Sequence, residues 1–166
     1  MDSVVTDPTI DPKALRKALG HFVTGVTVVT TRSASGDFAG LTVNSFSSLS
    51  LSPPLVMWSI ALSATSFEAF ETCSHFIVNV LAEDQIPLAE SFAQSGGDKF
   101  KDLPLRESIA GTPLLDGVAA SFVCRITSRY PGGDHSILVG EVLAYEQSER
   151  APLLYVRGRY CRLGEV

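Results

Sequence analysis

The stretch Val118-Ala-Ala-Ser-Phe-Val-Cys-Arg-Ile-Thr-Ser-Arg-Tyr130 alternates between apolar and polar side chains. One face carries Val118, Ala120, Phe122, Cys124 and Ile126, and the other carries Ser121, Arg125, Thr127 and Arg129. A period of two residues is typical of a β-strand with one face on the core and the other in solvent. The sequence therefore predicts a long, half-buried antiparallel strand.

Other strands are expected on both sides of this one. Residues 26–31 are rich in β-branched side chains, and the turn signal Ser35-Gly-Asp37 leads into residues 38–45, which predicts a hairpin. Further strands are expected at residues 55–60, 76–81, 137–145, 153–156 and 159–163. The Gly-rich segment before residue 137 predicts a tight turn.

Three short helices are expected, at residues 11–20, 66–73 and 85–94. Asp11 is suited to cap the first helix and Pro12 to its first position, and we expect this helix to cover one end of the fold. Many strands with few short helices favour a closed or partly closed antiparallel barrel over an α/β sandwich.

Composition restricts the class of protein. A chain of 166 residues with 45% hydrophobic residues fits one domain, expected at residues 11–166 after a flexible arm at residues 1–10. The net charge of -5 argues against nucleic acid and anionic membranes as partners. The chain has no run of 18 apolar residues, and the first ten residues lack a secretory signal pattern. Three widely spaced cysteines predict a reducing, cytoplasmic location and no metal site.

A hydroxyl-rich stretch, Gly40-Leu-Thr-Val-Asn-Ser-Phe-Ser-Ser-Leu-Ser-Leu-Ser-Pro-Pro54, precedes one of the expected strands. Its neutral donors and acceptors suit a polar, ring-bearing ligand: Thr42, Asn44, Ser45, Ser47 and Ser48. A Ser-rich strand edge and turn, with local side-chain to backbone hydrogen bonds, explains the same residues.

A second hydroxyl cluster, in Ser63-Ala-Thr-Ser-Phe-Glu-Ala-Phe70, lies where a helix is expected to begin. Free backbone N–H groups and hydroxyls at such a place suit a phosphate, although Thr65 and Glu68 also have the spacing of a capping box. Neither GxGxxG nor a Walker loop occurs in the chain. Any pyridine nucleotide must therefore bind without a Rossmann crossover.

The chain resembles the flavin reductase-like family, the reductase components of two-component flavin monooxygenases. Besides the Gly40 stretch, the resemblance rests on Thr24-Gly-Val-Thr-Val-Val-Thr30, Phe76-Ile-Val-Asn-Val-Leu81 and Gly133-Asp-His-Ser-Ile-Leu-Val-Gly-Glu-Val142, and it runs from about residue 15 to residue 163. It implies a mainly β, Greek-key split β-barrel that forms a homodimer. It also implies binding of FMN or FAD, reduction by NADH or NADPH, and delivery of reduced flavin to a separate monooxygenase.

The resemblance also assigns residues. It implies that flavin contacts come from the Gly40 stretch, Val43 included, that Ser63, Thr65 and Ser66 hold the flavin phosphate, and that His135 contacts the nicotinamide. Lys99 matches a basic position beside the flavin phosphate, and Phe92 and Phe100 are candidate flavin neighbours. A solvated lysine, a buried helix face and a loop anchor explain these last three equally well.

Other functions remain open on sequence alone. A non-catalytic flavin carrier or sensor would have the same pocket. A pyridoxine phosphate type of oxidase uses a related barrel, but its basic substrate-phosphate cluster is not found in this chain. A structural or interaction module would need only the sheet edge.

Overall fold

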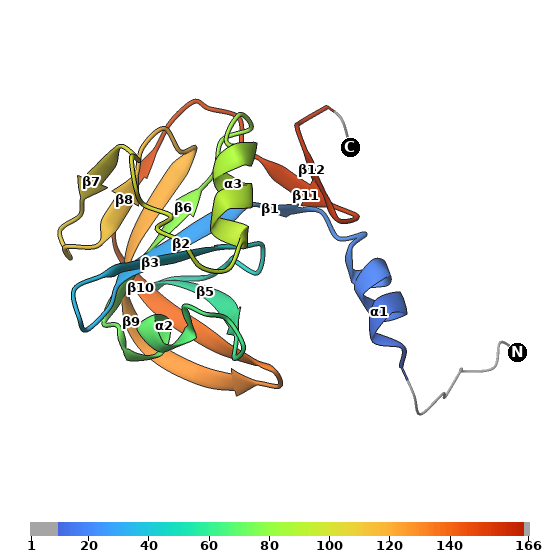
Figure 1. The fold of residues 1–166 in the computed structure, drawn as a ribbon, viewed down its shortest axis with the longest axis horizontal. Helices are drawn as coiled ribbons and strands as arrows, with labels where there is room; N and C mark the ends of the chain where they lie inside the picture. Colours follow the sequence, from blue (N-terminus) through green and yellow to red (C-terminus); the bar gives the residue numbers. More distant parts are fainter. Residues whose placement is uncertain (1–9, 165–166) are drawn as a thin grey trace, which may run out of the picture.

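A computed structural model describes residues 10–164 and shows a mainly β protein built around one seven-stranded antiparallel sheet (Figure 1). The predicted arm at residues 1–10 lies outside the described residues except for Ile10. The sheet comprises β2 (Thr27–Arg32), β3 (Phe38–Val43), β4 (Ser47–Leu51), β5 (Pro54–Ala61), β6 (His75–Val80), β9 (Ala120–Gly132) and β10 (His135–Gln147), in the order β3-β2-β6-β9-β10-β5-β4.

The two edge strands of this sheet, β3 and β4, are neighbours along the chain. Only residues 44–46 separate them, so the two edges must approach each other. Ser45 fixes this approach, because its Oγ donates to the Ser59 carbonyl of β5 and accepts from the Ser59 N–H, each at 3.0 Å. β3 and β5 thereby contact each other across the fold, and the predicted closed or partly closed antiparallel barrel is confirmed.

Aromatic side chains fill the interior of the barrel. Trp58 on β5 makes edge-to-face contacts with Phe70 and Phe76, at ring-centroid distances of 5.0 Å and 5.8 Å. All three are fully buried. Phe76 packs against Gly140 of β10, where a Cβ would lie only 2.5 Å from Phe76 Cζ. The core therefore requires glycine at this strand position.

The β9 strand is covered on both faces in its first half, which differs from the half-buried strand expected. Ser121 and Val123 point away from the barrel interior yet are buried. A small hairpin, β7 (Leu105–Glu107) with β8 (Pro113–Leu115), lies over this face, and its Leu114 packs on Val123. Exposed positions in β9 begin only at Arg125.

Two of the three expected helices, α2 (Phe67–Thr72) and α3 (Ile86–Ala93), pack on the barrel. The third, α1 (Pro12–Leu19), begins as predicted, because the Asp11 carboxylate accepts from the Lys13 N–H at 3.0 Å.

The expectation that α1 covers one end of the barrel is wrong. The helix projects from the body and buries no residue (Figure 1). Its apolar face is not covered by any of residues 10–164, since Leu15 and Leu19 expose 45% and 65% of their area. It adjoins a three-stranded sheet of β1 (Thr24–Gly25), β11 (Leu154–Val156) and β12 (Arg159–Cys161). The Arg157 N–H, between β11 and β12, donates to the carbonyl of Gly20, which follows α1.

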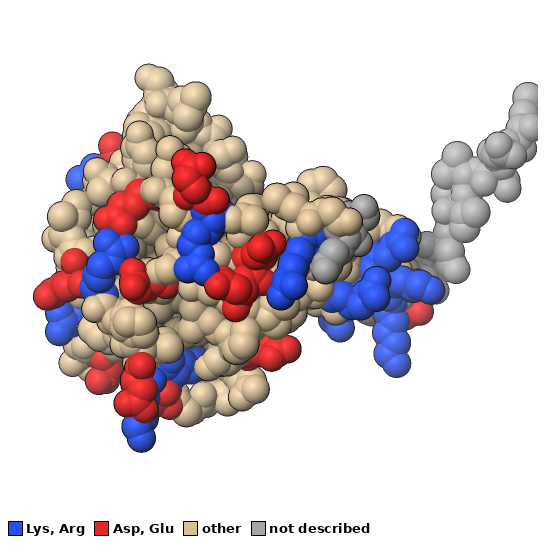
Figure 2. All heavy atoms as spheres, turned by 90° about the horizontal axis from the view of Figure 1, so that it is seen from above, with Lys and Arg blue, Asp and Glu red and all other residues tan. Residues whose placement is uncertain are grey.

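Charges are mixed over the barrel face in Figure 2, whereas α1 carries several basic side chains. Among residues 10–164 no helix has the length and apolar character needed to cross a bilayer.

Candidate functional site

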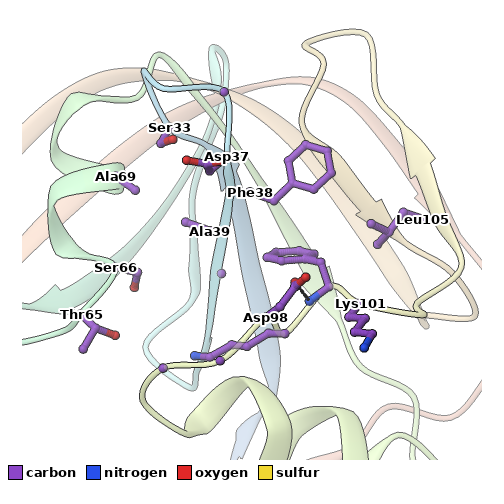
Figure 3. A pocket seen from close by; sticks show the side chains of 16 residues that line it. Ser33, Asp37, Phe38, Ala39, Thr65, Ser66, Ala69, Asp98, Lys101 and Leu105 are labelled. Carbon is purple, nitrogen blue, oxygen red and sulfur yellow. Dashed lines mark hydrogen bonds between the residues drawn. The ribbon is translucent and has the colours of Figure 1, made fainter.

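A cavity of about 720 Å³ lies between β3, the start of α2 and the loop that follows α3 (Figure 3). The β2–β3 hairpin contributes Ser33, Asp37 and Phe38 at one end. Thr65, Ser66 and Ala69 form one wall, and residues 96–101 form the opposite wall. Elements that are distant in sequence therefore meet around one pocket large enough for a nucleotide-sized ligand.

The floor of the pocket depends on a glycine in β3. A Cβ on Gly40 would lie 2.9 Å from Phe92 Cε1 and 3.1 Å from Phe100 Cζ. Phe92 is fully buried beneath the pocket and does not line it. It is therefore part of the buried face of α3 and not a neighbour of a ligand in this pocket. Phe100 does line the pocket and packs edge-to-face on Phe92 at 5.1 Å.

Two of the three predicted phosphate-binding hydroxyls line the wall formed by α2. Thr65 and Ser66 both face the cavity (Figure 3). Ser63 is exposed and does not line it. Ser66 is the N-cap residue, and no side-chain hydrogen bond caps the helix, so the predicted capping box does not form. The hydroxyls of Thr65 and Ser66 make no hydrogen bond to any described residue and can therefore serve a ligand.

Arg129 holds α2 in place from β9. Its guanidinium donates to the carbonyls of Phe70 and Cys73 at the end of the helix, at 3.0 Å and 2.6 Å. Cations are favourable at a helix C-terminus. The position of the Thr65 wall therefore depends on a strand residue outside the pocket.

Lys99 supplies positive charge on the wall opposite α2. Its ammonium donates to the Phe92 carbonyl at 3.2 Å and lies 6.0 Å from the Phe92 ring centroid. Partial burial lowers the pKa of Lys99 from its ordinary value. Two hydroxyls across the cavity from a partly desolvated cation form a site whose chemistry fits a phosphate.

The predicted ring-binding residues of the Gly40 stretch lie outside this pocket. Three of the hydroxyls bond internally: Thr42 to the Ala89 carbonyl at 2.6 Å, Ser45 to Ser59, and Ser47 to the Ser48 carbonyl at 3.1 Å. Thr42, Val43 and Asn44 also line a second cavity of about 190 Å³, together with Tyr155 and Tyr160. Ser48 is exposed on β4.

His135 lies at the tight turn of the β9–β10 hairpin, where the sequence placed it. Gly133 has φ +71° and forms a two-residue turn with Asp134, whose carbonyl accepts from Leu62 N–H at 2.9 Å. His135 Nδ1 lies 2.6 Å from Asp134 Oδ1, and this hydrogen bond lowers the pKa of Asp134. The imidazole is part exposed beside the end of β5, outside the Thr65 pocket.

The cysteines are free and buried. Burial raises the pKa of Cys124 to about 12 and also raises that of Cys73. In residues 10–164 no group of three His, Cys, Asp or Glu side chains could hold a metal ion.

The pocket lining contains hydroxyls, lysines, carboxylates and aromatic rings, but neither histidine nor cysteine. Such a lining can bind and orient a charged, ring-bearing molecule, whereas a nucleophile with an adjacent base is absent from it. Together, the antiparallel barrel and this lining define a barrel protein without a Rossmann unit whose pocket suits a nucleotide-sized, charged ligand.

Comparison with known proteins identifies the family of this barrel protein. The family described as "Flavin reductase like domain" matches residues 19–164, and this chain belongs to it. The resemblance noted from the sequence is confirmed.

Individual relatives cover nearly the whole chain. It is 43% identical over 150 residues to "FMN reductase (NADH) SmoA" of Agrobacterium fabrum, covering 90% of this chain and 85% of that protein. It is also 43% identical over 148 residues to "Flavin-dependent trigonelline monooxygenase, reductase component" of Acinetobacter baylyi, covering 89% of this chain and 48% of that protein. This chain spans about half the length of two of the curated relatives that it matches.

A solved structure extends the similarity to the fold. The NADH:FAD oxidoreductase SgcE6 of Streptomyces globisporus C-1027, in complex with NAD and FAD fragments, superposes with a TM-score of 0.87 at 36% identity. The match covers 95% of this chain and 98% of that chain.

Proposed function

We propose that this protein is a flavin reductase that uses NADH or NADPH to reduce FMN or FAD and supplies the reduced flavin to a separate monooxygenase. The observation that carries the proposal is the pocket in which Thr65 and Ser66 face Lys99 on a barrel of the flavin reductase-like family. The relatives support it, since their names include an NADH-dependent FMN reductase and a monooxygenase reductase component.

In the proposed reaction the protein binds and orients, and it needs no nucleophile of its own. When both were bound, the flavin and the nicotinamide would supply the hydride-transfer chemistry, and the residues of this chain would hold and orient them. Thr65 and Ser66 donate hydroxyl hydrogen bonds to the flavin phosphate, and Lys99 neutralises its charge. Asn44 offers a neutral amide to the edges of the ring.

His135 has a positioning role in this proposal. Its Nδ1 is engaged by Asp134, which leaves Nε2 directed away from that contact and able to bond the nicotinamide carboxamide. The imidazole then fixes the orientation of the nicotinamide and transfers no proton.

A homodimer is part of the proposal. Among residues 10–164, nothing covers the apolar face of α1 or the exposed Phe22, Leu49 and Leu51. Large exposed apolar side chains of this kind mark an interaction site when they lie together, and a second copy would bury them.

The test is NADH and NADPH consumption, followed by absorbance with FMN, FAD or no flavin added. We expect rapid consumption that requires added flavin. If the protein binds flavin but shows no flavin-dependent consumption of NADH or NADPH, it is a non-catalytic flavin carrier or sensor and not a reductase.

A further inference from the structure

The hairpin end of the pocket, formed by Ser33, Asp37 and Phe38, is not needed for a flavin mononucleotide. Thr65, Ser66 and Lys99 suffice for one phosphate, yet the cavity continues past them to this hairpin (Figure 3). β3 contributes Phe38, Ala39 and Gly40 to this cavity, whereas Thr42, Val43 and Asn44 at its other end line the separate, smaller cavity. A ligand with groups on both sides of its phosphates would place one group toward each end of β3.

The ring of Phe38 is the first unusual feature of the hairpin end. It exposes 42% of its area although it is a large apolar residue, and it lines the cavity. Its position is fixed by an edge contact with Phe100 at 5.6 Å and by the Arg32 guanidinium 5.7 Å from its centroid. An aromatic ring that is fixed in position and partly exposed can stack on a nucleobase.

Asp37 is the second feature. Its Oδ2 accepts from Ser35 Oγ at 2.8 Å, while Oδ1 accepts no hydrogen bond from any described residue. A carboxylate would repel a phosphate, but it accepts well from the hydroxyls of a ribose, as acidic residues do in dinucleotide sites on other folds. The cavity is therefore cationic near Lys99 and acidic near Asp37.

We propose that the hairpin end is a subsite for the adenosine of a dinucleotide, with Phe38 stacking on adenine and Asp37 accepting from the ribose hydroxyls. The adenosine is that of FAD in the first instance, because the subsite is continuous with the flavin-phosphate site, and this part rests on the proposed function. NADH carries the same adenosine, so the experiment must separate the two sources.

The experiment measures the affinities of FAD and FMN by quenching of flavin fluorescence, for the full chain and for Asp37→Asn and Phe38→Leu. We expect wild type to prefer FAD, and each variant to lose roughly tenfold in FAD affinity, with FMN affinity within about twofold of wild type. AMP alone should compete with FAD and not with FMN.

Matched controls exclude general effects of charge and aromatic loss. Glu149→Gln removes one negative charge at an exposed site outside the pocket, and Tyr145→Leu removes a ring that exposes 69% of its area. Both controls should leave the ratio of FAD to FMN affinity unchanged. Thermal unfolding identifies a Phe38→Leu protein that fails to fold, in which case Asp37→Asn carries the test.

The NADH arm measures KM for NADH with FMN as acceptor. A rise in KM of about tenfold in both variants, with FAD affinity unchanged, would assign the adenosine to NADH and keep the subsite. Equal losses for FAD and FMN, or no change in FAD affinity and in KM, would overturn it. Loss of reductase turnover with an intact preference for FAD would count against the proposed function and not against the subsite.

Discussion

At the scale of single residues, Lys99 is expected to govern binding of the flavin phosphate. Its ammonium is the cation opposite Thr65 and Ser66, and burial lowers its pKa below the ordinary 10.5. As pH rises through that lowered pKa the charge is lost, so FMN affinity should fall at a pH where an exposed lysine would still be charged. Riboflavin, which lacks the phosphate, should bind with little pH dependence.

Variants separate the charge from the side chain. Lys99→Met should weaken FMN binding by about tenfold or more at pH 8 and remove the alkaline dependence. Lys99→Arg should retain affinity at high pH because guanidinium stays protonated. Titration calorimetry with FMN and riboflavin checks this, and equal losses for both ligands would indicate damage to the fold.

His135 tests whether the site uses a protein base. Loss of an orienting hydrogen bond in His135→Ala should lower the efficiency of flavin reduction by roughly five- to tenfold, with unchanged FMN affinity and no new pH dependence. Loss of a general base would cost about 10²- to 10⁴-fold and change the shape of the pH profile of the rate. Stopped-flow reduction across pH distinguishes the two, and an unaffected rate would refute any role for His135.

At the scale of elements, the contact of β10 with β6 is the most sensitive point of the sheet. Gly140→Ala would place a Cβ 2.5 Å from Phe76 Cζ and 3.0 Å from Cys124 Cβ. Because Phe76 is fully buried against Trp58, the ring cannot move freely, and we expect a loss of about 1–3 kcal/mol in the free energy of unfolding.

Urea denaturation measures this loss. Gly25→Ala is the matched control, since a Cβ there meets nothing within 4 Å, and it should be near neutral. Adding Phe76→Leu to Gly140→Ala should destabilise less than the sum of the single changes, because the smaller side chain relieves the clash. Additive losses would contradict the assigned contact.

Elements with a strong periodic or turn signal could be predicted from the sequence. The alternation around Cys124 gave β9, and the glycines before His135 gave its hairpin turn. β4 could be predicted only as one alternative, a Ser-rich strand edge, because an exposed edge strand of Ser and Leu lacks a buried face to give alternation. β7 and β8 have three residues each and no period to detect.

The candidate site could be predicted only where residues lie in one local motif. Thr65 and Ser66 stand together before a helix, and Lys99 follows a glycine pair, so local chemistry indicated a phosphate. Asp37 and Phe38 could be read only as a turn and a strand start. Their place in the pocket follows from the approach of β3 to the loop after α3, which the sequence does not encode locally.

At the scale of the whole molecule, the exposed apolar residues predict the assembly. Leu51 exposes 93% of its area and Phe22 80%, and α1 buries no residue at all. We expect an obligate homodimer that buries more than about 2,000 Å² in total. Sedimentation at micromolar concentration should give twice the chain mass, and a folded, active monomer would refute it.

A charged residue in the apolar patch tests where the dimer forms. Leu19→Glu on α1 should weaken self-association, since an unpaired buried charge is costly at an interface. Ile109→Glu serves as the control, because Ile109 exposes 77% of its area and lies between β7 and β8, on the side of the molecule away from α1 (Figure 1).

The three-residue connection between β3 and β4 also bears on how the chain can be altered. Loop-closure entropy grows only with the logarithm of length, so extending residues 44–46 from three to nine residues would cost only about 1 kcal/mol. The same residues include Asn44 and Ser45, one proposed to meet the flavin ring and the other joined to Ser59. An insertion there should therefore leave a folded protein whose ring recognition is altered, which makes this connection a place to change flavin selectivity without dismantling the barrel.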